Sequence, residues 1–90
     1  MPAIGDYNHM NMKVLVVVVA YRDVGVSVND ICDYIMETGD EVSEGQVKYH
    51  LTNWITKGKV LPGRKEIRED YFKNTMFYYP TEAGIRMIEG

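Results

Sequence analysis

The hydrophobic residues are spaced as in helices over the first part of the chain and as in strands over most of the remainder. The first apolar segment, from Met10 to Val24, is hydrophobic on nearly every side and contains the run VLVVVVA. Valine favours strands, but a segment of about 15 residues is longer than a usual strand. We therefore expect a buried helix over residues 10–24, preceded by a loose N-terminus over residues 1–8.

A second helix is predicted after the glycine at position 25. The VSV sequence that follows this glycine can make one short strand pairing, and Ser27 is a suitable N-cap. The next apolar residues share one helix face at i, i+3, i+4 and i+7: Val28, Ile31, Cys32 and Ile35. Cys32, the single cysteine, lies on this face and is expected to be a core residue. Gly39 is expected to end the helix.

The third helix has the most clearly marked start. Ser43 and Gln46 form the S-x-x-Q pattern of a capping box, and Val42 and Val47 can pack together as a hydrophobic staple. We expect a helix over residues 43–58. Its apolar face continues through Leu51, Trp54, Ile55 and Gly58.

Beyond this helix the sequence is rich in strand-forming residues. The segments KVLPGRKEIRED and NTMFYYP predict a β-hairpin over residues 60–80, with a polar and aromatic tip in EDYFKN. Thr81 is expected to cap a short C-terminal helix. The predicted fold class is therefore α+β: a three-helix core, a short strand, a hairpin and a final helix in a single domain over residues 9–90.

Charge is distributed unevenly around a net charge of −3. The first 45 residues contain two basic and eight acidic residues, whereas residues 46–73 contain seven basic and three acidic residues. Such asymmetry says more about partners than the total charge does, so the basic segment favours a nucleic-acid partner. A mixed-charge solvated surface is the alternative, because hairpins often carry Lys and Arg at their edges.

Other function classes receive little support from the sequence. The apolar run is much shorter than the roughly 20 residues of a membrane span, and Arg22 and Asp23 follow it, so we expect a cytoplasmic protein. No glycine-rich phosphate loop and no nucleophile with a base and an orienting group is recognisable, so we expect no enzyme activity. His9 and Asp6 lack metal-ligand spacing, and His50 is expected to be satisfied within the fold. We expect neither a metal nor a cofactor.

The element order and the end of the chain together resemble a known group of proteins. The sequence YYPTEAGIRMI is similar to the Y-x-L-T-x-x-G-x-x-x-L signature that ends the wing in small winged-helix regulators of the MarR and PadR kinds. Pro80 occupies the leucine position. The resemblance covers roughly residues 12–89 and implies a winged helix-turn-helix, most often a transcriptional regulator. The matching residues are Tyr78, Thr81, Gly84 and Ile88.

The resemblance makes the polar face of the helix at 43–58 the candidate recognition surface for the DNA major groove. Asn and Gln can bond adenine, Lys can reach guanine or phosphate, and Thr can contact the thymine methyl group. This face has no acidic residue beyond Glu44 in the first turn. The predicted contacts are Gln46, Lys48, Tyr49, Thr52, Asn53 and Thr56 on the helix, and Arg64, Lys65, Arg68 and Lys73 on the wing.

These observations predict sequence-specific binding of double-stranded DNA. The alternative is a protein–protein interaction module that keeps the fold without binding DNA, which the acidic first half and the pI of about 5.3 favour. Tyr71 and Phe72 are either exposed at the hairpin tip or folded back onto the hairpin. The Val14–Val19 run is apolar on more faces than one small core covers, which predicts a homodimer through helix 10–24.

Overall fold

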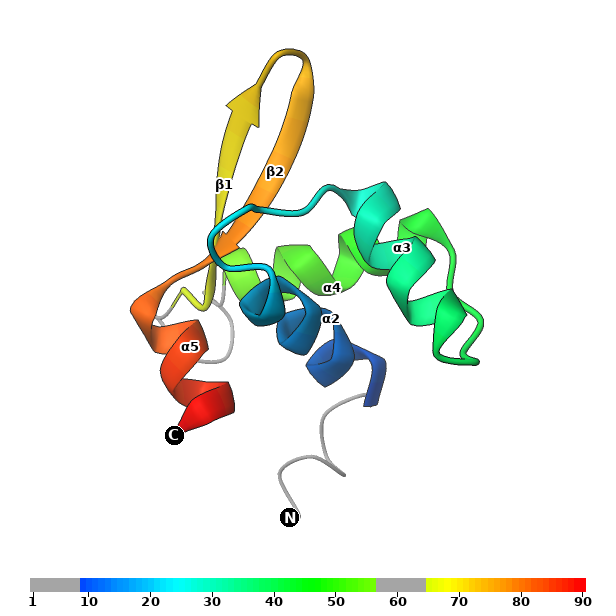
Figure 1. The fold of residues 1–90 in the computed structure, drawn as a ribbon, viewed down its shortest axis with the longest axis horizontal. Helices are drawn as coiled ribbons and strands as arrows, with labels where there is room; N and C mark the ends of the chain where they lie inside the picture. Colours follow the sequence, from blue (N-terminus) through cyan, green and yellow to red (C-terminus); the bar gives the residue numbers. More distant parts are fainter. Residues whose placement is uncertain (1–8, 57–64) are drawn as a thin grey trace.

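The chain forms four helices and one antiparallel hairpin within the residues that the computed structural model describes, 9–56 and 65–90. This arrangement confirms the α+β class (Figure 1). The predicted loose terminus at 1–8, the end of the third helix at Gly58 and the first residues of the hairpin lie outside the described residues. The elements are α2 (His9–Ala20), α3 (Val28–Glu37), α4 (Glu44–Thr56), β1 (Ile67–Phe72), β2 (Thr75–Pro80) and α5 (Glu82–Glu89).

Helix α2 occupies the centre of the domain and packs against α3, α4, α5 and β2. Its valine run is almost entirely buried, and only Val16 in this run is exposed, at 44%. The surplus apolar surface expected on this helix is therefore small, because the surrounding elements cover most of it. No helix among the described residues is long and apolar enough to cross a membrane.

The predicted helix over residues 10–24 is wrong at its C-terminal end. Residues 21–24 form a turn, in which the Tyr21 carbonyl accepts hydrogen bonds from the amides of Val24 and Gly25. Gly25 has a φ of 84°, and a Cβ atom there would lie 2.5 Å from the Tyr79 ring. Val26 then makes the expected short pairing, an antiparallel bridge to Tyr78.

The predicted starts of α3 and α4 are both confirmed by reciprocal hydrogen bonds. The Ser43 hydroxyl accepts from the Gln46 amide at 3.2 Å, and the Gln46 side chain accepts from the Ser43 amide at 2.9 Å. Ser27 caps α3 in the same way with Asp30, whose carboxylate replaces the Gln or Glu of the usual pattern. Gly39, at a φ of 99°, follows the end of α3 as expected.

The hairpin turns at Lys73 and Asn74 alone, so the predicted tip EDYFKN is too long. Both residues have positive φ, 50° and 66°, as the two-residue hairpin turns that match strand twist require. The register pairs Ile67 with Pro80 at the base and Phe72 with Thr75 at the tip. Tyr71 and Phe72 are 62% and 59% exposed, which excludes the folded-back alternative.

The start of α5 is tied closely to the residue before β1. Thr81 is the N-cap, accepting from the Gly84 amide at 3.2 Å and donating its hydroxyl to the Lys65 carbonyl at 2.5 Å. The Glu66 carbonyl accepts from the Thr81 amide at 3.0 Å. Gly84 is buried against this carbonyl, and a Cβ atom at Gly84 would collide with it. The glycine of the wing-end signature thus permits a close backbone approach.

Candidate nucleic-acid interface

The inner face of α4 is anchored by a buried polar network as well as by apolar packing. The Trp54 indole donates to the backbone carbonyl of Asn11 at 2.8 Å, and the Asn11 side-chain oxygen lies 3.0 Å from Nδ1 of His50. All three side chains are buried, and Val47 and Leu51 share the same face of α4. These contacts to α2 determine which face of α4 points outward.

His50 is satisfied within the fold, as predicted. Only 5% of the residue is exposed, and burial lowers the pKa of its imidazole. Nδ1 donates to the Asn11 oxygen in the tautomer that this pairing requires, since an amide oxygen can only accept. His50 therefore belongs to the support of α4, and the Tyr49 ring meets it edge-on at 5.4 Å.

Four of the six predicted contacts on α4 are exposed: Gln46, Lys48, Tyr49 and Thr52. Tyr49, the aromatic residue among these four, is 65% exposed. Asn53 is half-buried at the edge of this surface, and the side chain of Thr56 lies outside the described residues. Apart from Glu44 in the first turn, α4 carries no acidic residue.

Two of these side chains already make hydrogen bonds that restrict what they can offer a ligand. The Gln46 carbonyl oxygen is occupied by the capping box, which leaves its amide group as a donor. The Thr52 hydroxyl donates to the Lys48 carbonyl at 2.9 Å, so it presents its methyl group and acceptor lone pairs. Lys48 and Tyr49 extend from the helix beside them and remain exposed.

The predicted wing contacts are spread along the hairpin and its approach. Lys65, Arg68 and Lys73 are exposed, whereas Arg64 lies outside the described residues. The Arg68 guanidinium sits over the Tyr79 ring, 4.4 Å from its centroid, and Lys73 Nζ is 5.3 Å from the Phe72 ring centroid. Figure 1 shows α4 running from α3 toward the base of this hairpin.

The described part of this surface is less basic than residues 46–73 as a whole. Glu69 and Asp70 are exposed on β1, on opposite faces of the strand, while Glu66 is buried. Lys57, Lys59 and Arg64, which supply much of the positive charge of residues 46–73, lie outside the described residues. The described part of this candidate surface is thus a helix face with one exposed lysine beside a hairpin of mixed charge.

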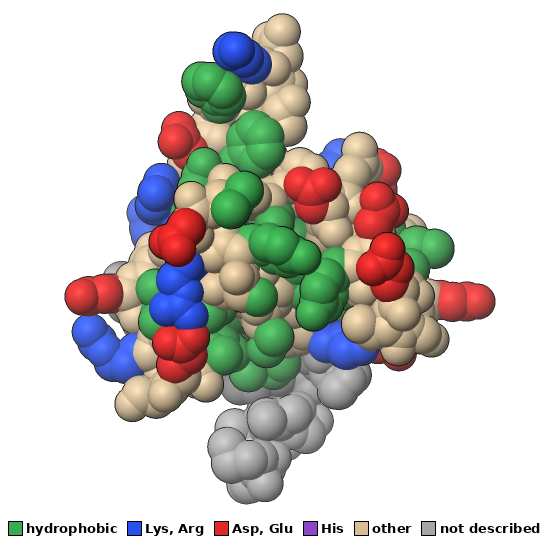
Figure 2. All heavy atoms as spheres, in the orientation of Figure 1, with side chains coloured by type: hydrophobic (Ala, Val, Ile, Leu, Met, Phe, Trp, Pro, Cys, Tyr) green, Lys and Arg blue, Asp and Glu red, His purple; other side chains and the backbone are tan. Residues whose placement is uncertain are grey.

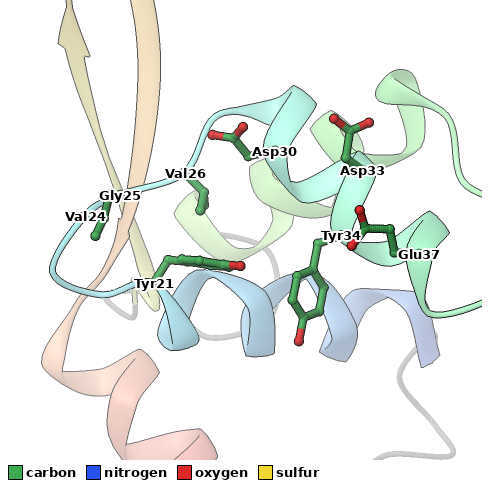
Figure 3. A pocket seen from close by; sticks show the side chains of 8 residues that line it. All are labelled: Tyr21, Val24, Gly25, Val26, Asp30, Asp33, Tyr34 and Glu37. Carbon is green, nitrogen blue, oxygen red and sulfur yellow. The ribbon is translucent and has the colours of Figure 1, made fainter.

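A second surface was missed by the sequence reasoning. Asp30, Asp33, Tyr34 and Glu37 recur at i, i+3, i+4 and i+7 and therefore form one polar face of α3. Together with Tyr21 and residues 24–26 they line an open cavity of about 350 Å³, here called the α2–α3 groove (Figure 3). Figure 2 shows acidic side chains gathered over α3 beside an apolar area over α2.

The aromatic part of the groove could not be read from the sequence, because its two rings come from different elements. Tyr21 from the turn after α2 and Tyr34 from α3 meet edge to face, with ring centroids 6.0 Å apart. The sequence does show the helical spacing of the acidic residues on α3. This pattern alone does not indicate a binding site, because a charged helix face is usually just exposed to solvent.

Comparison of the chain with protein-family models, with curated proteins and with solved structures gave no significant match. Function is therefore inferred from the residues and their arrangement.

Proposed function

We propose that the domain binds double-stranded DNA in the manner of a winged helix-turn-helix regulator, with α4 in the major groove and the β1–β2 hairpin as the wing. One observation carries the proposal. The inner face of α4 is held by Asn11, Trp54 and the apolar core, so that Lys48, Tyr49 and Thr52 point outward from a helix that is anchored to the domain. Recognition elements need this kind of fixed support.

The dimensions of α4 suit such a role. Its 13 residues correspond to roughly 20 Å of helix, and the major groove, roughly 12 Å wide, admits a single α-helix. Lys48 and Thr52 lie one helical turn apart on the outer face. We assign guanine or phosphate to Lys48 and the thymine methyl group to Thr52.

The remaining polar residues of α4 are assigned to DNA groups according to the hydrogen-bond donors and acceptors that they have free. Gln46 cannot make the two-bond contact to adenine without leaving its cap, so we assign its amide to a phosphate near the helix N-terminus. The Tyr49 hydroxyl is likewise assigned to phosphate, and the half-buried Asn53 to a base edge.

The hairpin supports the proposal through its basic residues. Lys65 and Lys73 stand near its two ends, and Arg68 is held over Tyr79 between them. Each can neutralise a phosphate of the DNA backbone. Glu69 and Asp70 oppose close approach along the middle of β1, so the wing is expected to position the domain on the DNA backbone rather than to read sequence.

The test is titration of a mixed-sequence DNA duplex at several salt concentrations. Lys48→Glu should weaken binding about tenfold or more, and each lost phosphate contact should reduce the slope of log K against log salt by roughly one unit. Arg86→Glu makes the same charge change at an exposed residue of α5, a helix that carries none of the proposed DNA contacts, and serves as the matched control.

Two results would refute the proposal. One is the absence of duplex binding even at low salt. The other is an equal loss of affinity in the Lys48→Glu and Arg86→Glu proteins, because that result would reflect net charge alone. In either case the protein-interaction alternative would account better for the exposed polar face of α4.

A further inference from the structure

The α2–α3 groove combines negative charge with aromatic surface. Asp33 and Glu37 border it, and within the described residues neither carboxylate forms an ion pair or hydrogen bond. Asp30 also lines the groove but accepts the capping hydrogen bond from Ser27. The described residues hold no group of His, Cys, Asp or Glu arranged to bind a metal ion. The groove therefore favours an occupant that is both cationic and aromatic.

The aromatic side of the groove is preformed. The edge-to-face contact of Tyr21 and Tyr34 orients both rings, and each residue remains 40% exposed. Val24, which also lines the groove, is 72% exposed. The cavity of about 350 Å³ falls at the lower end of the size of ligand pockets, roughly 300–1,000 Å³, so it suits one or two large side chains.

The hairpin tip of this same chain has the complementary chemistry. The wing tip, defined as residues 71–74, presents Tyr71 and Phe72 to solvent, with the Lys73 ammonium group beside the Phe72 ring. The two positive φ angles at Lys73 and Asn74 make a tight two-residue turn that holds these side chains at the end of the hairpin. Exposed aromatic rings beside a cation are typical of residues that anchor an interface.

The wing tip cannot enter the groove of its own chain. Val26 lines the groove and forms a bridge to Tyr78 on the hairpin. Asn74, at the tip, lies four residues from Tyr78, so the strand carries the tip roughly 13 Å away from this bridge. Figure 1 shows that the hairpin projects away from the helices, with its tip at the far end. A contact between tip and groove therefore requires a second molecule.

We propose that the wing tip of one copy of this chain docks in the α2–α3 groove of a second copy. The Phe72 ring packs against Tyr21 and Tyr34, and the Lys73 ammonium group lies between the rings and the carboxylates of Asp33 and Glu37. The contact area is small, so the association is weak and appears at high micromolar to millimolar concentration. It weakens as salt screens the charges.

Sedimentation velocity over a concentration series, without DNA, measures this association. Lys73→Glu and Glu37→Lys should each lower the association constant about tenfold, because each replaces an attraction with a repulsion. Combining both substitutions in one chain should restore most of it. Glu41→Lys makes the same charge change in the α3–α4 connection, outside the groove, and should leave association unchanged.

Backbone amide NMR spectra recorded on dilution locate the contact and show that each variant is folded. We expect resonances of Tyr34 and Glu37 to shift together with those of Phe72 and Lys73. A monomer at millimolar concentration, a failure of the charge-swapped double variant to recover, or shifts centred on Val16 of α2 would overturn the proposal. Lys48→Glu separates it from DNA binding, because this variant should associate normally while binding DNA poorly.

Discussion

Gly84→Ala is the substitution whose effect follows most directly from the structure. A Cβ atom at this position would collide with the carbonyl oxygen of Glu66 and lie 3.1 Å from its carbonyl carbon, where ordinary carbon–carbon contacts are about 3.5–4.0 Å. The obstacle is backbone, and the same carbonyl accepts the Thr81 amide that starts α5. Relief of the clash must therefore move α5 or the start of β1.

The size of the effect is a balance of two terms. Replacing glycine by alanine inside a helix gains about 1 kcal/mol, whereas overpacking typically costs 1–3 kcal/mol and here meets the backbone. Because the obstacle is backbone, the overpacking cost should lie at the upper end of this range, which leaves a net loss of about 2 kcal/mol. For a domain of this size that loss lowers Tm by roughly 10 °C.

The chain contains a matched control in Gly45→Ala. Gly45 also lies near the start of a helix, but the nearest atom to an added Cβ would be the Ser43 hydroxyl at 3.8 Å, an ordinary contact. This variant should be more stable by about 0.5–1 kcal/mol. Urea unfolding followed by fluorescence of the buried Trp54 gives both values. Equal stabilisation by the two substitutions would contradict the close approach of Gly84 to the Glu66 carbonyl.

Three further predictions concern the contacts that hold the helices. Asn11→Ala should cost about 1–3 kcal/mol in urea unfolding, because it leaves the buried His50 without its partner. Burial lowers the pKa of His50 from 6.5, so the unfolded state binds more protons, and stability should fall as pH drops below 6.5. A His50→Gln chain should lose that part of the pH dependence, and an unchanged profile would contradict the assignment. Ser27→Ala should cost about 1 kcal/mol by removing the cap of α3, with Asn29→Ala as an exposed control that leaves stability nearly unchanged.

The sequence by itself determined the features that depend on neighbours a few residues apart. Ser27, Ser43 and Thr81 were predicted as helix caps because a cap binds an amide only two or three residues ahead. The burial of Ile31, Cys32 and Ile35 followed from helical spacing, and the exposed residues of α4 lie opposite its apolar positions for the same reason.

The tertiary structure decided where elements end and which distant residues meet. Helix α2 stops at Ala20 because Gly25 packs under Tyr79 and Val26 pairs with Tyr78, contacts more than fifty residues apart in the sequence. The hairpin turn shortened to two residues because the strand register extends β1 to Phe72. The α2–α3 groove depends on the same folding of the α2–α3 connection, which brings Tyr21 beside Tyr34. Such contacts have no local signal, since they arise only when separate elements bury their apolar faces together.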